Sequence, residues 1–274
     1  MHPRPAHRAS FAPARPEIAA AAGGREALLC VRRAACGHVV EQLRRGERLA
    51  PRVLDAGAGA VQACVLPTQA GPLAGDHDRV RIVVGADAVL VVRPIAATVA
   101  LPGSARTRLD LHVEVGPGAR LVLEDPTLIV AAGADVERRT TVRLAAGAVA
   151  ALRDTVVLGR AGERGGRLVS TLRITGDAGV VLHDELRLDP ASSLRDAHVA
   201  LAPGHRVVGT LCLLGAEADA GYELARGGAL RRATAAGLAE LDAELASPWA
   251  RWAAGVVAPG HQEGPARTNA TLST

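Results

Sequence analysis

The stretch RVRIVVGADAVLVV, residues 79–92, alternates charged and apolar residues, turns at Asp87-Ala88 and continues as a second apolar run. Alternation with a period of two indicates a half-buried β-strand, and Gly or Asp marks the turn after it. The same pattern recurs at 109–115, 139–144 and 168–174. The turns lie 31, 29 and 30 residues apart, at Asp87-Ala88, Gly118-Ala119, Gly147-Ala148 and Asp177-Ala178. The sequence thus contains a weak internal repeat whose unit is a strand, a turn and a return strand.

One such unit cannot bury its own apolar face, so the units are expected to stack on one another. The repeat therefore predicts a mainly β fold, in which stacked hairpins form a layered or helical arrangement like a β-solenoid. The alanine after each turn is expected at a place where neighbouring strands crowd together. A β-sandwich with regularly spaced hairpins is the alternative that the same pattern allows.

The segments on either side of the repeat differ from it in composition. Residues 1–24 are rich in Pro, Ala and Arg, which predicts a disordered N-terminal arm. A single β-rich domain is expected over 25–255, and a flexible tail over 256–274. Near the start of this domain, a strand pair is expected around the turn at Cys36-Gly37.

One or two helices are expected at the C-terminal end of the domain. A helix is predicted over 229–245, because four leucines fall on one side at helical spacing: Leu230, Leu238, Leu241 and Leu245. Pro248 follows directly after Ser247 and is expected to end or kink this helix.

The composition supports a core of small aliphatic side chains. Hydrophobic residues make up 49% of the 274 residues, yet the chain has only one Phe, one Tyr and two Trp. A wide pocket lined by aromatic rings cannot be built from this set. The net charge of +4 comes with a basic excess that is nearly all Arg, and a solvated Arg-rich surface is the expected interpretation. Nucleic-acid binding is not expected, because almost no aromatic side chain can stack on bases.

Motif searches give no sign of an enzyme, a secreted protein or a membrane protein. The GxSxG, Walker A, HExxH and GxGxxG motifs are missing, so a non-catalytic protein is expected. The first twenty residues lack the apolar region of a signal peptide, and no uncharged apolar run reaches the ~18 residues of a membrane span. We therefore expect a cytoplasmic protein.

Two groups of residues have the side chains that metal ions prefer. The first is Cys30, Cys36 and His38, whose thiol and imidazole groups suit a borderline metal. The second is Asp76-His77-Asp78, in which the two aspartates can share one face of a strand. For the first group buried structural cysteines are the alternative. For the second, the alternative is a turn in which Asp76 binds nearby backbone N–H groups.

Three segments, taken in order and spacing, resemble the UreD (UreH) family of urease accessory proteins. Residues 66–76, LPTQAGPLAGD, are similar to the family's Gly-Gly-Leu-x-Gly-Gly-Asp signature, with Ala70 and Ala74 in place of glycines. Residues 118–129 repeat its Gly-Ala-x-Leu turn followed by Pro and Ile. Residues 157–163, VLGRAGE, resemble its Leu-Gly-Arg-x-x-x-Gly-Glu segment, with the final Gly-Glu shifted by one position. The resemblance covers roughly residues 50–215.

The resemblance implies a scaffold without catalysis of its own. Such proteins bind a UreF-type partner, which recruits the UreG-type nickel GTPase, and the assembly docks on apo-urease. It also implies a β-rich fold with two C-terminal helices and a passage that conducts nickel. No permanently bound cofactor is implied, only transient Ni²⁺. The alternative function is a carbohydrate-active or ligand-binding β-solenoid, against which the few aromatic residues argue.

The resemblance also implies candidate site residues. A conduit needs weak, spaced ligands, because a closed site would trap the ion. Four carboxylates are candidates for the transient nickel passage: Asp76, Asp154, Glu163 and Glu124. Asp154 departs from the family, which usually has Glu there. For each of the four, a surface position or a salt bridge to a nearby Arg is the alternative role. Trp249 and Trp252 are candidates for partner binding, with packing on the sheet of the same chain as the alternative.

Overall fold

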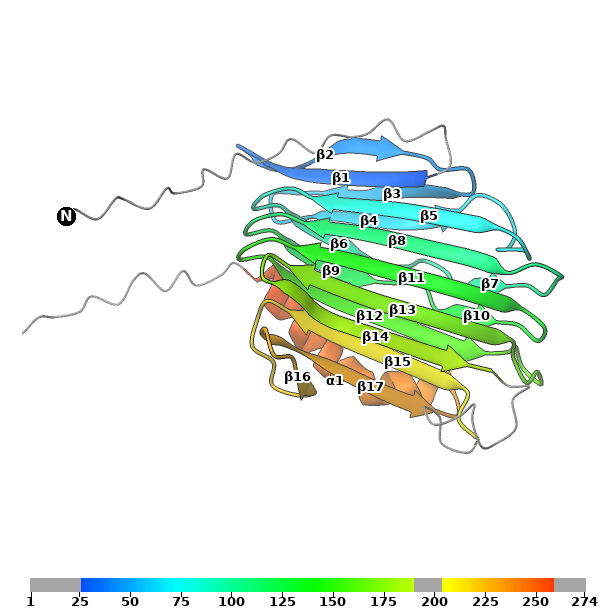
Figure 1. Cartoon of the computed structure of the whole chain (residues 1–274). Coiled ribbons are helices and arrows are strands. Elements are labelled where there is room, and N and C mark those ends of the chain that lie inside the picture. The colour runs from blue at the N-terminus through cyan, green and yellow to red at the C-terminus, as the bar shows by residue number, and fades with distance from the viewer. Residues whose placement is uncertain (1–25, 190–203, 259–274) are drawn as a thin grey trace, which may run out of the picture.

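The computed structural model of the chain describes residues 26–189 and 204–258, and in these ranges the chain forms two long β-sheets and one helix (Figure 1). The predicted arm over 1–24 and all but the start of the predicted tail over 256–274 lie outside the described residues.

Sheet A carries the strands that precede the repeat turns. It has seven strands in the order β14-β13-β11-β8-β5-β1-β2. Their bounds are β1 (Glu26–Ala34), β2 (Gly37–Arg44), β5 (His77–Val84), β8 (Thr107–Val115), β11 (Asp135–Leu144), β13 (Arg167–Gly176) and β14 (Gly179–Leu188). The predicted strand pair around Cys36-Gly37 is confirmed, because β1 and β2 pair antiparallel across that turn.

Sheet B carries the return strands. Its main path has the order β16-β17-β15-β12-β9-β6-β4-β3, and two short strands, β7 and β10, pair beside β12. The bounds are β3 (Leu49–Ala56), β4 (Val61–Pro67), β6 (Val89–Val92), β7 (Thr98–Ala100), β9 (Arg120–Glu124), β10 (Leu128–Val130), β12 (Val149–Leu158), β15 (Val207–Leu214), β16 (Tyr222–Glu223) and β17 (Gly228–Ala235).

The repeat unit is one coil of a β-solenoid, which confirms the predicted layered arrangement and refines its detail. The strands β5, β8, β11 and β13 are parallel neighbours in sheet A, and β6, β9 and β12 are parallel neighbours in sheet B. The two arms of a unit therefore face each other across the core instead of pairing as a hairpin. Only the last unit is a true hairpin, since β13 and β14 pair antiparallel around Asp177.

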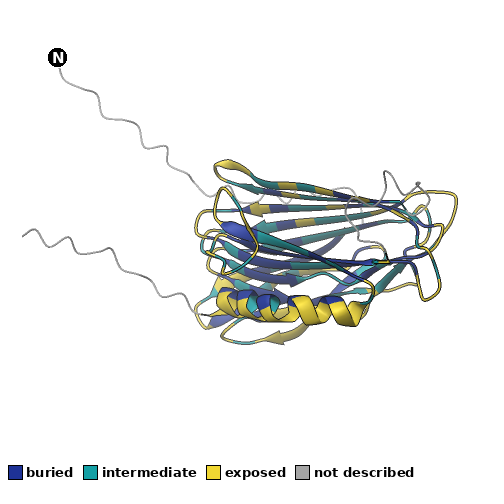
Figure 2. Ribbon diagram, turned by 90° about the horizontal axis from the view of Figure 1, so that it is seen from below, coloured by how far each residue is buried: buried dark blue, intermediate teal, exposed yellow. Residues whose placement is uncertain are grey.

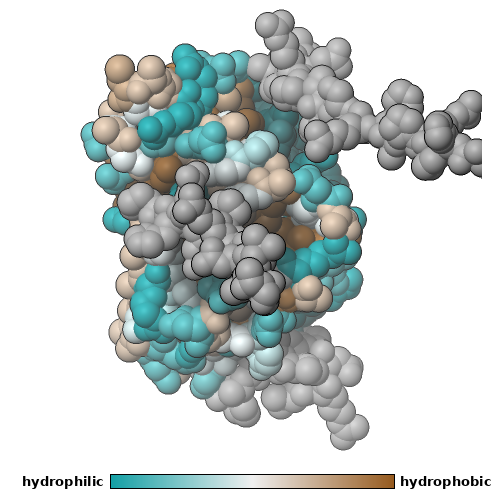
Figure 3. Space-filling view, turned by 90° about the vertical axis from the view of Figure 1, so that its left-hand side faces the viewer, coloured by the Kyte–Doolittle hydropathy of each residue, from teal (hydrophilic) through white to brown (hydrophobic). Residues whose placement is uncertain are grey.

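The three stacked repeat turns share a left-handed backbone at the residue before the alanine, and hydrogen bonds join each of them to the next. Asp87, Gly118 and Gly147 have φ angles of 56°, 65° and 69°. The N–H of Asp87 donates to the carbonyl of Pro117 at 2.9 Å in the next coil, and the N–H of Gly118 donates to Ala146 at 3.2 Å. The alanine after each stacked turn is buried, at Ala88, Ala119 and Ala148, whereas Ala178 in the final hairpin is exposed. Crowding thus explains the alanine in three of the four units. Figure 3 looks onto this end of the molecule, where only a small hydrophobic area shows.

The core between the sheets is divided into two aliphatic layers. The layer near the repeat turns includes Ile82, Leu121 and Ile174, and the layer near the opposite end includes Leu128, Leu168 and Leu188. Polar side chains and two cavities lie between these layers. A third apolar cluster lies on the other face of sheet B, under the helix.

The helix α1 (Leu238–Val257) covers the outer face of sheet B, with its buried side against the strands and its other side exposed (Figure 2). The predicted helix over 229–245 is therefore wrong at both ends. Residues 228–235 form β17, which pairs with β15. Pro248 lies inside the helix, because the buried stripe that Leu241 and Leu245 begin continues through Trp252 and Val256.

Among the described residues, no helix combines the length and apolar character needed to cross a membrane.

Candidate functional site

Two adjoining cavities lie between the sheets, at the level where the aliphatic layers part. The larger has a volume of about 120 Å³ and the smaller about 50 Å³. Both exceed the ~10–15 Å³ that one water molecule requires. Five residues line both cavities and so form the partition between them: Leu111, Leu123, Asp125, Arg138 and Thr140.

A row of polar side chains follows these cavities from strand to strand, and we call it the polar belt. Sheet A contributes inward-facing residues of β5, β11, β13 and β14, and sheet B contributes residues of β12, β15 and β17 and the residue after β9. The belt consists of Asp78, Asp125, Arg138, Thr140, Ser170, Asp154, Asp184, Thr210 and Arg232. Four of its members are aspartates and two are arginines, and Arg48, from outside the belt, pairs with one of the aspartates.

Arg138 is the centre of the belt. Its guanidinium is buried, and it donates to both carboxylate oxygens of Asp154, through Nη1 at 2.5 Å and through Nη2. Its Nε donates to Ser170 Oγ at 3.0 Å, from the neighbouring strand β13. Asp125 lies on a third side, with its Oδ2 3.8 Å from Nη1 of Arg138. One cation from sheet A is thus held by two carboxylates from the sheet B side.

Asp125 is the least satisfied carboxylate of the belt. Its 3.8 Å contact with Arg138 is its one side-chain ion pair or hydrogen bond in the described part of the chain. Burial raises the pKa of Asp125 to about 6, against the lowering effect of Arg138 and with a further rise from the nearby Asp154 carboxylate. Its side chain is 30% exposed, and the space that it faces is the pair of cavities.

The remaining ionic groups of the belt are paired. Asp184 of β14 accepts from Arg232 of β17 at 2.5 and 3.3 Å, and this pair joins the two sheets at one end of the smaller cavity. At the larger cavity, Arg48 binds Asp78 at 2.9 Å and Asp76 at 2.7 Å. Each aspartate of the belt therefore has a guanidinium group beside it, from Arg138 or Arg232 within the belt or from Arg48.

Two of the four candidate carboxylates line the cavities. Asp154 lines the smaller cavity and Glu124 the larger one. Asp76 and Glu163 line neither of these two cavities. All four are paired with an arginine, namely Arg138, Arg153, Arg48 and Arg160. Each of the four carboxylates thus forms the salt bridge that the alternative role predicted. Asp154 and Glu124 also lie in a cavity wall.

Glu163 has the geometry of a structural residue. Its Oε2 accepts from the backbone N–H groups of Arg160 at 2.9 Å and Ala132 at 3.1 Å, so it ties together two neighbouring turns. Its Oε1 accepts from Arg160 Nε at 2.7 Å. These hydrogen bonds lower the pKa of Glu163 to about 2. Asp76 also has a turn role, because it accepts from the N–H of Leu73, as the turn alternative predicted.

The two tryptophans lie differently on α1. Trp252 is 4% exposed, packs in the cluster under the helix, and donates from its indole N–H to Asp219 at 3.0 Å. Its environment is therefore that of the alternative, packing on its own chain. Trp249 is half-buried at the border of the same cluster, and a partner-binding role remains a prediction for it.

Neither of the two residue groups that the sequence suggested as metal ligands forms a metal site among the described residues. In the described residues, no group of three or more His, Cys, Asp or Glu side chains is placed to hold a metal ion. The Cys30 thiol donates to Glu41 at 3.3 Å, and burial raises its pKa to about 12. His38 is buried instead between Arg33 and the N–H of Val89, and burial lowers its pKa.

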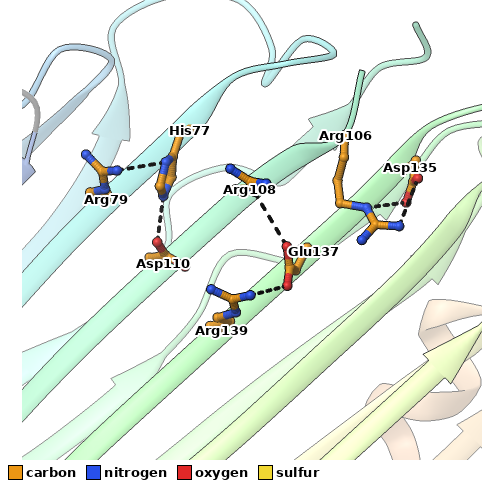
Figure 4. Close-up of polar contacts among 8 residues, drawn as sticks. All are labelled: His77, Arg79, Arg106, Arg108, Asp110, Asp135, Glu137 and Arg139. Atoms are coloured by element: carbon orange, nitrogen blue, oxygen red, sulfur yellow. Dashed lines mark hydrogen bonds and ion pairs between the residues drawn. The ribbon is translucent and has the colours of Figure 1, made fainter. Parts of the chain in front are cut away.

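The outer face of sheet A carries charges that largely neutralise each other (Figure 4). His77 points outward, away from Asp78, with its Nε2 2.6 Å from Asp110 and its Nδ1 2.9 Å from Arg79. Glu137 lies between Arg108 and Arg139, and Arg106 binds Asp135 through two hydrogen bonds of 3.2 Å. This network agrees with the expected solvated, Arg-rich surface.

Acidification should reveal the raised pKa of Asp125. Because its pKa is higher in the folded than in the unfolded chain, it binds a proton first in the folded state as the pH falls from 7 to 5. Its contribution to the free energy of unfolding therefore rises on acidification, by roughly 1 kcal/mol at pH 5. We expect the stability of the wild type relative to Asp125→Asn to increase by that amount in urea titrations at pH 7, 6 and 5. Parallel stability curves for the two proteins would contradict the buried, cavity-facing position of Asp125.

Comparison with known proteins gives one consistent family. The family model described as UreD urease accessory protein matches residues 19–262. A urease accessory protein UreD of Parafrankia sp. is 38% identical over 199 residues, which is 64% of this chain and 66% of that protein. A protein of Streptomyces griseus named urease accessory protein UreD 1 is 37% identical over 191 residues, covering 69% and 74% of the two chains. A Frankia alni relative is 48% identical over 130 residues, but the match spans only 44% of its length.

Proposed function

Because the chain belongs to the UreD urease accessory protein family, we propose that it acts in urease maturation as a non-catalytic scaffold that passes nickel to apo-urease. The observation that carries this proposal is the polar belt, in which carboxylates follow two adjoining cavities between the sheets. Ni²⁺ is the cargo in this proposal and not a resident cofactor. The carboxylates that would contact it are Asp154 and Glu124, Asp78 of the Asp76-His77-Asp78 group, and the newly identified Asp125. The cytoplasm is the proposed place of action.

The chemistry of the belt suits an ion that must leave each stop. Oxygen ligands that are already paired with arginine bind a divalent cation weakly, and weak multiple stops permit transport. A thiolate would bind nickel more firmly, and Cys212 lines the smaller cavity. Burial raises the pKa of Cys212 to about 12, with a further rise from Asp184, so the thiol keeps its proton at neutral pH. Most of the polar groups that line the two cavities are therefore oxygen ligands, and the one thiol among them is protonated in the absence of metal.

The size of the cavities favours an ion over a sugar. Pockets that bind organic ligands usually enclose ~300–1,000 Å³. The larger cavity has a volume of about 120 Å³, which accommodates a hydrated ion and a few water molecules but not a saccharide. The carbohydrate-binding solenoid is therefore the weaker alternative.

Delivery to urease requires partners, and we propose a UreF-type protein, a UreG-type GTPase and apo-urease. The exposed side of α1 and the half-buried Trp249 form the surface that we assign to one of them. Large, amphipathic side chains of this kind are enriched at the centres of protein interfaces.

The function can be tested by deletion and restoration in a host that has urease and no second copy of this gene. We expect deletion to leave urease protein present but low in nickel and activity, and the restored chain to recover both. Co-purification of the tagged chain with the accessory proteins tests the partner assignment. Urease that stays fully active and nickel-loaded after deletion would refute the proposal.

A further inference from the structure

One of the five residues of the partition between the cavities is a cation, which is unexpected in a passage for cations. Arg138 lines both cavities and is only 6% exposed. Its fixed positive charge repels a divalent ion, and the Asp154 and Asp125 carboxylates beside it offset part of that repulsion. The role of Arg138 is therefore central to how an ion could pass.

Arg138 contacts three oxygen donors of kinds that can also bind a metal ion. Its Nη1 lies 2.5 Å from Asp154 and 3.8 Å from Asp125, and its Nε lies 3.0 Å from the Ser170 hydroxyl. Two carboxylates and a hydroxyl, all oxygen donors, thus surround the guanidinium between the sheets. Carboxylate oxygens also bind divalent cations, and among the first-row metals a given site binds Ni²⁺ more tightly than Mn²⁺, Fe²⁺ or Co²⁺.

Arg138 binds the two carboxylates with different strength, so an arriving cation would displace the guanidinium from Asp125 before Asp154. Asp154 is bound through both oxygens, whereas Asp125 makes only the longer contact and faces both cavities. An ion in either cavity therefore meets Asp125 first. It can bind there while Arg138 stays on Asp154.

We propose that Arg138 holds the place of the transported cation, so that the Asp125–Asp154 pair acts as a transient stop and not as a permanent metal site. This inference rests on the proposed nickel passage. In the absence of metal, the guanidinium neutralises the pair. When a divalent cation arrives at Asp125, it competes with the guanidinium for the carboxylates, and the return of Arg138 drives the ion onward.

Removing the guanidinium should turn the stop into a stable site. The full chain, purified in the complex that it forms in the cell, would be titrated with NiCl₂ by calorimetry. We expect Arg138→Met to bind one extra Ni²⁺ at least about 100-fold more tightly than the wild type binds at this place, because repulsion by a unit charge is lost. Arg138→Lys, which keeps the charge, should show no such gain.

The matched control uses the other guanidinium of the belt. Arg232 pairs with Asp184 and Thr210, so only one carboxylate remains after Arg232→Met, and no new nickel site is expected. The double variant Arg138→Met/Asp125→Asn should lose the gain. A gain that persists in the double variant, or appears equally in Arg232→Met, would overturn the inference.

A loss of stability in the variant can itself be used as a test, because metal bound to the uncompensated carboxylates should stabilise the folded variant. If Arg138→Met is unstable, Ni²⁺ is expected to raise its melting temperature and not that of the wild type, and Arg138→Gln provides a second variant. A folded Arg138→Met or Arg138→Gln with wild-type nickel binding would sink the inference. The nickel passage itself would still stand or fall by nickel loading of urease in cells that carry the wild-type chain.

Discussion

Replacing Thr140 with tryptophan is expected to slow nickel transfer to urease by about tenfold or more, since an added barrier of only about 1.4 kcal/mol has that effect. Thr140 is one of the five residues that line both cavities, and it points inward from β11 beside Arg138. An indole ring at this position fills the space through which the two cavities adjoin. The measurements are the rate of urease activation and the nickel content of urease in cells that carry the variant.

The adjacent residue provides a matched control. Thr141 has the same side chain on the same strand, but it faces outward, in register with His112 and Arg173. Thr141→Trp is expected to leave nickel transfer close to that of the wild type. Thermal melting and co-purification with the accessory partners would show whether each variant folds and assembles. A folded, assembled Thr140→Trp that still loads nickel at the normal rate would exclude the interior route.

The stacking of the coils could be predicted from the sequence because the repeat turns require particular residues at two positions. The left-handed position needs Gly or Asp, and the next position needs a residue as small as alanine, as at Gly118-Ala119. Spacing alone could not distinguish a hairpin from a coil. That choice depends on whether the return strand pairs with its own unit or with its neighbours, and such pairing is decided by the whole stack.

The centre of the candidate site was missed, although the sequence contains a signal for it. In β11, Val136 and Val142 face inward, so alternation also places Arg138 and Thr140 inward. A charged residue in the inward phase of a strand is costly unless it is paired, which makes it a marker of an interior polar site. Asp125 gives no comparable signal, because it follows the end of β9 and its direction depends on the chain's path into Pro126.

The C-terminal helix shows where local rules fail. Proline was expected to end the helix near Pro248, but the helix continues to Val257. Burial of Trp252 and Val256 against sheet B outweighs the loss of one backbone hydrogen bond. The helical spacing of Leu230 predicts a helix in the stretch before α1, whereas pairing with β15 makes this stretch a strand.

The segment with the most specific family resemblance, residues 157–163, leads into a close contact between coils at Gly166. The N–H of Gly166 donates to the carbonyl of Val130 at 3.1 Å, and Gly159 donates to the same carbonyl at 2.8 Å. A Cβ atom on Gly166 would lie 2.5 Å from the carbonyl oxygen of Ala131 and closer still to that of Ala134. Both are backbone atoms of a neighbouring turn, so neither can move aside cheaply.

Gly166→Ala is therefore expected to lower the free energy of unfolding by about 3 kcal/mol or more. Gly162→Ala is the matched control in the same loop, because its φ is +78° but no atom lies within 4 Å of an added Cβ. It should cost only about 1 kcal/mol, the price of a left-handed alanine. Urea unfolding of both variants measures the difference. Equal losses would mean that the turn around Ala131 is free to shift, and that the motif acts through something other than this contact.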